Sequence, residues 1–125
     1  MSTIIATTLS NGSVSVPTAT VVNGSAKAWV NLNGTGTIAA RDSFNVASLT
    51  DTGTGAYTVN LTASMNNADY APVYYMEGGF DVQRYQSSGT QLVGSCALRA
   101  GYQTGTSLVQ ADIGTICLAL LGDLA

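Results

Sequence analysis

Seven carboxylates and two cysteines are the main candidates for catalysis in this chain of 125 residues, because the sequence contains no histidine. Without histidine, the Ser-His-Asp and Cys-His arrangements lack the base that must lie within reach of the nucleophile. Cleavage of a glycosidic bond needs two carboxyl groups that flank it. No pair of this kind is recognisable among the acidic residues Asp42, Asp51, Asp69, Glu77, Asp81, Asp112 and Asp123. The sequence therefore predicts a protein that is not an enzyme and has no catalytic residues.

Metal and cofactor ligands are equally sparse. Structural zinc sites use four ligands, and Cys96 and Cys117 cannot supply four. The segment 51–55, DTGTG, offers oxygen atoms but lacks the acidic repetition of a calcium loop. A phosphate-binding loop would lead into a helix and carry a lysine, whereas the glycines of NLNGTGTI lead into a predicted strand. We therefore expect no metal and no cofactor.

The two cysteines lie in the apolar runs LVGSCAL and TICLALL. The first residues, MSTIIATTLSNGSVSV, lack the basic start and apolar core of a secretory signal, so we expect folding in a cytoplasm. Disulfides are rare in that compartment. Reduced, buried thiols at Cys96 and Cys117 are therefore predicted in preference to a disulfide, although the spacing alone leaves their pairing open.

The distribution of charged and apolar residues argues against nucleic acid and membranes as partners. Net charge is −3, and the four basic residues are scattered singly, whereas a nucleic-acid site needs clustered Lys and Arg. No apolar run reaches the roughly 18 residues of a spanning helix, so membrane insertion is not expected. Charged residues make up only 9% of the chain. Because charges are depleted in the cores of interfaces, this low share favours a surface that another subunit covers.

Alternation with a period of two is the dominant pattern, and it predicts β-strands. In KAWVNLN, Ala28, Val30 and Leu32 share one side, and AYTVNLT places Tyr57, Val59 and Leu61 inward. Short strands separated by turn signals every 8–12 residues indicate an antiparallel sandwich. The predicted fold is an all-β, jelly-roll-like β-sandwich over residues 25–125, with no long helix. Further predicted strands are TIAAR, FNVASL, YAPVYYM, FDVQRYQ, QLVGSCALRA, TSLVQAD and TICLALL, and predicted turns include DTGTG, MNNAD, SSGT, YQTGT and DIG.

Two local features complete the predicted architecture. Asn33-Gly34 lies between alternating segments and predicts a hairpin with a type I′ turn, whose two central residues need positive φ. Residues 1–24 contain no aromatic and no charged side chain, and Pro17 argues against a central strand. We expect a short extended N-terminal arm there. Exchange of the arm between subunits or its docking in a larger assembly, and a flexible lead-in, are alternatives that the sequence leaves open.

A candidate oligomer or partner surface is formed by aromatic and amide side chains. Trp29, Asn31 and Asn33 lie on the face of a predicted strand opposite its apolar residues, where tryptophan is either covered or offered to a partner. Adjacent Tyr74 and Tyr75 must face opposite sides, so one of them points outward. Tyrosine gives large contact area at low entropic cost. The candidate surface residues are Trp29, Asn31, Asn33, Tyr75, Tyr85 and Tyr102.

Residues 23 to 70 contain the linked motifs KAWVN-NGTGT, RDSFNV-S-TD-GTG-YTVN and M-NA-Y. With these motifs the chain resembles a β-module common in virion proteins of tailed bacteriophages, notably tail-fibre-like proteins of marine phages. Beyond residue 78 the resemblance is confined to the closing strands around VQADIGTICLALL. No binding residues carry over from this family.

The resemblance implies a structural protein of the virion, made in the host bacterial cytoplasm. We expect a homotrimeric fibre or spike-type appendage that presents a host-attachment surface. Its expected partners are other copies of itself, other virion proteins through residues 1–24, and a glycan or protein of the host surface. The alternative is a capsid decoration protein, a head fibre or cement protein, and a glycan-degrading spike is disfavoured by the missing carboxylate pair.

Overall fold

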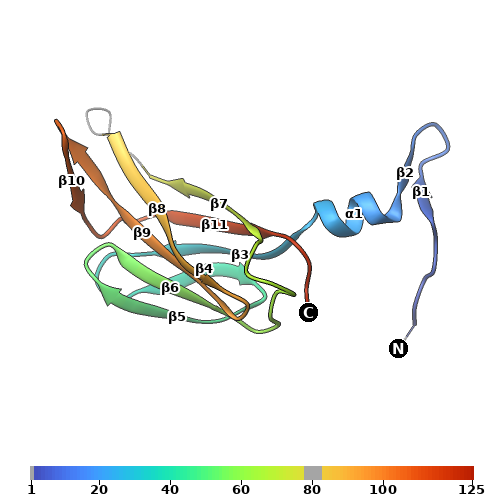
Figure 1. Cartoon of the computed structure of the whole chain (residues 1–125), viewed down its shortest axis with the longest axis horizontal. Coiled ribbons are helices and arrows are strands. Elements are labelled where there is room, and N and C mark those ends of the chain that lie inside the picture. Colours follow the sequence, from blue (N-terminus) through green and yellow to red (C-terminus); the bar gives the residue numbers. More distant parts are fainter. Residues whose placement is uncertain (1, 78–82) are drawn as a thin grey trace.

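The computed structural model describes the backbone of residues 2–77 and 83–125, and the side chains of 2–77 and 89–125. The described residues form two antiparallel sheets that pack against each other, preceded by an arm (Figure 1). No helix among the described residues is long and apolar enough to cross a membrane. The elements are β1 (Thr8–Ser10), β2 (Ser15–Pro17), α1 (Thr18–Gly24), β3 (Ala26–Asn33), β4 (Ala39–Phe44), β5 (Val46–Gly53), β6 (Ala56–Leu61), β7 (Ala71–Met76), β8 (Gln83–Leu92), β9 (Ser95–Thr104), β10 (Ser107–Gln110) and β11 (Ile116–Leu121).

The first sheet has the strand order β4-β3-β11-β7, so the first and last strands of the sandwich pair at its centre. The second sheet is built on β9. Residues 95–99 of β9 pair with β6, and residues 101–104 pair with β10, so these two strands follow one another along the same edge. β8 occupies the other edge of β9, and β5 extends the sheet beyond β6. The predicted all-β sandwich is confirmed.

The core lies between the two sheets and follows the predicted alternation. Each strand places every second side chain on the face that meets the other sheet. The inward residues of KAWVNLN and AYTVNLT are buried as expected. The core also takes Met65, Tyr70 and Ile113 from loops. The inward strand residues are Ala28, Val30, Leu32, Tyr57, Val59, Leu61, Met76, Cys96, Leu98, Ala100, Ile116, Leu118 and Leu120.

β3 and β4 form the predicted hairpin, but the prediction of a type I′ turn at Asn33-Gly34 is wrong. Asn33 is the last residue of β3, and the connection runs over residues 34–38, with positive φ at Gly36 only. Gly34 is instead held in the body of the sandwich. Its N–H donates to the carbonyl of Ile113 at 3.0 Å, and a Cβ at this position would lie 2.7 Å from the Tyr57 hydroxyl. This glycine therefore serves a close approach between segments.

Asn45 marks the point where the chain leaves the first sheet for the second. Its φ is 56°, in the left-handed region that asparagine tolerates better than most residues. The side-chain amide donates to the carbonyls of Lys27 and Ala63, both at 3.0 Å, and its oxygen accepts from Ala63 N at 2.7 Å. Asn45 thus fastens the β4–β5 crossing to β3 and to the segment after β6.

The arm is more structured than the predicted extended segment. β1 and β2 pair as a hairpin, and α1 follows immediately (Figure 1). No residue from 2 to 25 is buried. The Lys27 amine, itself buried at the start of the sandwich, donates to the carbonyls of Val22 and Ser25. The end of α1 is therefore tied to β3, and the arm points away from the sandwich.

The prediction of a turn at residues 87–90, SSGT, is also wrong, because this segment lies inside β8. The register between β8 and β9 shifts between Ser88 and Gln91, and a Cβ on Gly89 would lie 2.7 Å from the Cβ of Ala97. Glycine here allows an irregular, close strand pair. The turn falls instead at residues 93–94, within the predicted strand QLVGSCALRA. The start of the predicted strand FDVQRYQ lies outside the described residues.

Candidate functional site

The outward face of the first sheet carries two rows of side chains set by strand register. Residues that pair directly on antiparallel strands point to the same face. One row runs Phe44, Trp29, Ala119, Val73 from β4 to β7, and the next runs Asp42, Asn31, Cys117, Tyr75. We call these eight residues the Trp29 face. It brings three predicted surface residues together, namely Trp29, Asn31 and Tyr75.

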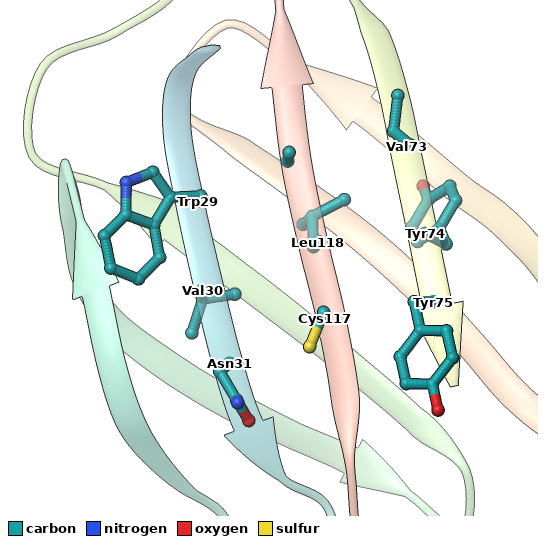
Figure 2. Close-up of a pocket in the computed structure, with 9 residues that line it drawn as sticks. Trp29, Val30, Asn31, Val73, Tyr74, Tyr75, Cys117 and Leu118 are labelled. Atoms are coloured by element: carbon teal, nitrogen blue, oxygen red, sulfur yellow. The ribbon is translucent and has the colours of Figure 1, made fainter. Parts of the chain in front are cut away.

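The Trp29 face is hollowed along its centre. Ala119 and Cys117 of β11 have small side chains, whereas the neighbouring strands carry Trp29, Val73 and Tyr75. The result is a shallow groove of about 270 Å³. Figure 2 shows Cys117 on the central strand, between the strands that carry Trp29 and Tyr75. A row of small residues between large ones gives side chains of a partner a place to insert.

Large apolar side chains on this face are unusually open to solvent. Trp29 is 38% exposed, Phe44 53% and Tyr75 61%. Within the two rows the one charged residue is Asp42, at the β4 edge. Single exposed apolar residues are normal on soluble proteins, but a contiguous uncharged group of this kind marks an interaction surface.

Asn31 is held in place by Arg41. One guanidinium nitrogen donates to Asn31 Oδ1 at 3.1 Å and to the Leu32 carbonyl at 2.9 Å. The other terminal nitrogen donates to the Gly114 carbonyl at 2.6 Å. Arg41 therefore joins the bulged β3–β4 pair to the loop before β11. This contact fixes one end of the groove.

The remaining predicted surface residues do not join this face. Asn33 closes the local loop, with its amide donating to the Thr35 carbonyl at 2.9 Å and its oxygen accepting from the Thr35 hydroxyl at 2.8 Å. Tyr102 lies in the second sheet, half-buried, opposite Val109 of β10. Tyr85 belongs to β8, where its backbone pairs with Gly101, but its side chain lies outside the described residues.

The two cysteines have different environments, and both are free. Cys96 is fully buried, 3.7 Å from the Tyr74 hydroxyl, and burial raises the pKa of its thiol. This agrees with the predicted reduced, buried thiol, and burial of this kind makes a thiol unreactive. For Cys117 the prediction of a buried thiol is wrong, because its side chain faces outward and is only partly covered. Tyr74 and Tyr75 do face opposite sides, as predicted.

Three acidic side chains accept hydrogen bonds from backbone N–H groups. Asp42 Oδ1 accepts from Ser43 N at 2.8 Å, and Asp51 Oδ1 accepts from Gly53 N at 2.9 Å. Asp112 Oδ1 accepts from Gly55 N at 2.7 Å and lies 2.9 Å from the Tyr57 hydroxyl. These two donors hold the pKa of Asp112 below its ordinary value.

Tyr57 and Asp112 therefore form a structural junction between loops at one end of the sandwich. The Tyr57 hydroxyl also lies 2.8 Å from the Gly34 carbonyl oxygen. Burial, followed by the neighbouring Asp112 carboxylate, raises the Tyr57 pKa.

Among the described residues, no three Cys, Asp or Glu side chains come together in a group that could hold a metal ion.

Sequence reasoning identified Trp29 but missed most of its neighbours. Phe44, Val73, Cys117 and Ala119 come from three other strands and join the face only through strand register. One local signal was available for Cys117 and Ala119. In TICLALL the larger residues Ile116, Leu118 and Leu120 alternate with smaller ones, which places Cys117 and Ala119 on the opposite face.

The fold and the surface together define an antiparallel β-sandwich with an uncharged, exposed groove and a projecting arm. Comparisons with protein-family models, with curated proteins and with solved structures give no match. The function is therefore inferred from the sequence motifs and from the surface itself.

Proposed function

We propose that this chain is a structural protein of a tailed-bacteriophage virion, a homotrimeric fibre or spike-type appendage that presents a host-attachment surface. The proposal starts from the motifs KAWVN-NGTGT and RDSFNV-S-TD-GTG-YTVN, through which the chain resembles phage fibre modules. The structural observation that carries it is the Trp29 face. An aromatic, hollowed sheet face whose one charged residue, Asp42, lies at its edge suits assembly with other proteins.

The role is one of binding and scaffolding. Asp42, Asp51 and Asp112 are engaged with backbone N–H groups of turns and loops, which explains these residues without chemistry on a substrate. The arm reaches beyond the sandwich, where it can contact a neighbouring copy or another virion protein. Host attachment then falls to surfaces that assembly leaves open, with a glycan or a protein of the bacterial surface as ligand.

A capsid decoration protein is the second candidate. The observation that favours it is the small body, a single sandwich over residues 25–125, joined to an arm with no buried residue. A sandwich of this size suits an ornament on a shell. On the phage head, a trimer of such bodies would ornament or stabilise the shell, with the arms as anchors.

Localisation on virus particles tests the proposal and separates the two candidates. Antibodies against the purified chain would be bound to particles of the phage that encodes it and viewed with gold labels by electron microscopy. We expect label at the tail or at an appendage. Label over the head would establish the decoration role, and particles that carry no label would overturn both. Light scattering on the purified chain should give three times the mass of one chain, and a stable monomer would contradict the trimer.

A further inference from the structure

The hairpin of the arm is amphipathic, and none of the residues that the structure describes covers its apolar side. Leu9 pairs with Val16, so both point to one face, and Val14 lines the same shallow hollow. Thr8 and Ser15 lie on the opposite face of the two strands. Alternation of this kind is typical of a sheet that packs on one side. One face of the hairpin therefore offers apolar side chains for contact with a partner.

The sandwich of the same chain does not provide that partner. An isolated two-stranded hairpin is marginally stable in water and needs packing against another surface. In Figure 1 the hairpin lies beyond α1, remote from both sheets. Lys27 fixes the end of α1 against the start of β3, which holds this direction. Because the described part of the sandwich does not reach the hairpin, a second molecule is the natural source of a covering surface.

The Trp29 face matches the arm in charge and in shape. Residues 1–24 contain no charged side chain, and the groove is lined by Trp29, Asn31, Val73, Tyr75, Cys117 and Ala119, which are also uncharged. The charged groups nearby, Asp42 at the β4 edge and Arg41 beside Asn31, lie at the margins of the groove, so contact at its centre does not bury an ion. The small side chains of Ala119 and Cys117 leave room for branched side chains such as Leu9 and Val16.

The areas favour reciprocal exchange. At the roughly 200 Å² that one aromatic side chain buries, the exposed parts of Trp29, Phe44 and Tyr75 amount to about 300 Å². A stable interface needs about 800 Å² from each partner. These three side chains supply less than half of that area, and a copy that gives its arm and also receives one contributes two surfaces. Exchange of an identical element is a low-cost route to closed oligomers.

We propose that the Leu9–Val14–Val16 side of the arm packs on the Trp29 face of a second copy of this chain. The inference rests on the proposed homo-oligomeric virion protein and assigns its assembly contact. Each copy then has its groove filled by a neighbour, and the arm is the link that holds the copies together. The first and last strands of the sandwich, β3 and β11, form the floor of the receiving site.

Cys117 is a native reporter of this contact, because it lies in the groove and Cys96 is fully buried. The rate at which a charged maleimide labels the native full-length chain would be measured together with its mass by light scattering. We compare Leu9→Asn/Val16→Asn with the matched control Thr8→Asn/Ser15→Asn, which alters the adjacent positions on the opposite face. Both variants change exposed residues, so circular dichroism should show the same folded sandwich for both.

We expect the unaltered chain and the control to be oligomeric and Leu9→Asn/Val16→Asn to fall to monomer. Labelling of Cys117 should become about ten-fold faster in that variant, the change expected when nine of ten grooves are otherwise occupied. An oligomer with unchanged labelling in Leu9→Asn/Val16→Asn would overturn the arm contact and leave the virion role standing. A monomeric unaltered chain would overturn both the arm contact and the trimer.

A cross-linking variant tests the contact directly. Leu9→Cys places a thiol on the apolar side of the arm, and mild oxidation should join it to Cys117 of another copy. A ladder of covalent oligomers is expected on a non-reducing gel, together with loss of free Cys117 in peptide maps. Thr8→Cys, on the opposite face, should give little product. Equal cross-linking of the two variants would overturn the inference, because it would show contact without the proposed orientation.

Discussion

Replacement of Asn45 is the sharpest test of how the chain passes between the sheets. Asn45→Ala removes the side-chain hydrogen bonds to Lys27 O, Ala63 O and Ala63 N, and it leaves a residue with a Cβ at φ 56°. Asn45→Gly removes the same bonds but accepts the left-handed backbone. The two variants therefore separate the contribution of the side chain from that of the backbone conformation.

The structure sets the expected magnitudes. Three hydrogen bonds at roughly 0.5–1.5 kcal/mol each, on a half-buried side chain, give a loss of about 2 kcal/mol in the free energy of unfolding for Asn45→Gly. The left-handed conformation adds about 1 kcal/mol for alanine, so Asn45→Ala should lose about 3 kcal/mol. With a urea dependence of roughly 1.5 kcal/mol per molar, the midpoints fall by roughly 1.3 M and 2 M.

Urea unfolding followed by Trp29 fluorescence measures both losses, because Trp29 is the only tryptophan. Asn66→Ala, at an exposed asparagine in the loop between β6 and β7, is the matched control and should stay within about 0.5 kcal/mol of the unaltered chain. Equal losses for the alanine and glycine variants would refute the backbone part of the reasoning. Losses below about 0.5 kcal/mol in both would refute the hydrogen-bond part.

Three further predictions concern the loops at the Tyr57 end of the sandwich. Tyr57→Phe should lower the free energy of unfolding by about 1–2 kcal/mol in urea, because its single hydroxyl proton serves the Gly34 carbonyl and the Asp112 carboxylate. Since the pKa of Asp112 is lowered in the folded state, its contribution is present above the ordinary value near about 4 and is lost as pH falls through the lowered pKa. Asp112→Asn should therefore flatten the decline of urea midpoints between about pH 5 and pH 2, and an unchanged slope would contradict this. Gly55→Ala should lose roughly 3 kcal/mol in thermal or urea unfolding, because its φ is +62° and a Cβ would overlap the Ala100 carbonyl. Gly105→Ala, with φ +57° and open space around it, should lose only about 1 kcal/mol, and similar losses for both glycines would count against the overlap.

Patterns that depend on one strand were predictable from the sequence. Val30 and Val59 are inward because each strand buries one face, and a period of two records that burial directly. Trp29 was predicted to face outward for the same reason. The fold class followed from the repetition of such strands and turns along the chain.

Features that depend on contacts distant in sequence were not predictable. Gly34 looks like half of a tight turn, but its N–H is used by Ile113, which belongs to a loop far along the chain. The groove needs Val73 and Ala119 beside Trp29, and only the register of three strands brings them together. α1 was missed because it spans only seven residues, four of them β-branched Thr or Val, and its signals are only Pro17 before it and Gly24 at its end.

The pairing of β3 with β11 also determines when the sandwich can fold. Leu32 lies opposite Ile116, so the central contact of the first sheet joins residues from opposite ends of the sandwich in sequence. Contacts of such long separation must overcome a large loop-closure entropy, which slows folding. During synthesis, β3 pairs with β4 first, and its other edge has no partner until β11 has emerged from the ribosome. Completion of the first sheet therefore waits for β11, and a nascent chain stalled before residue 116 should remain sensitive to protease.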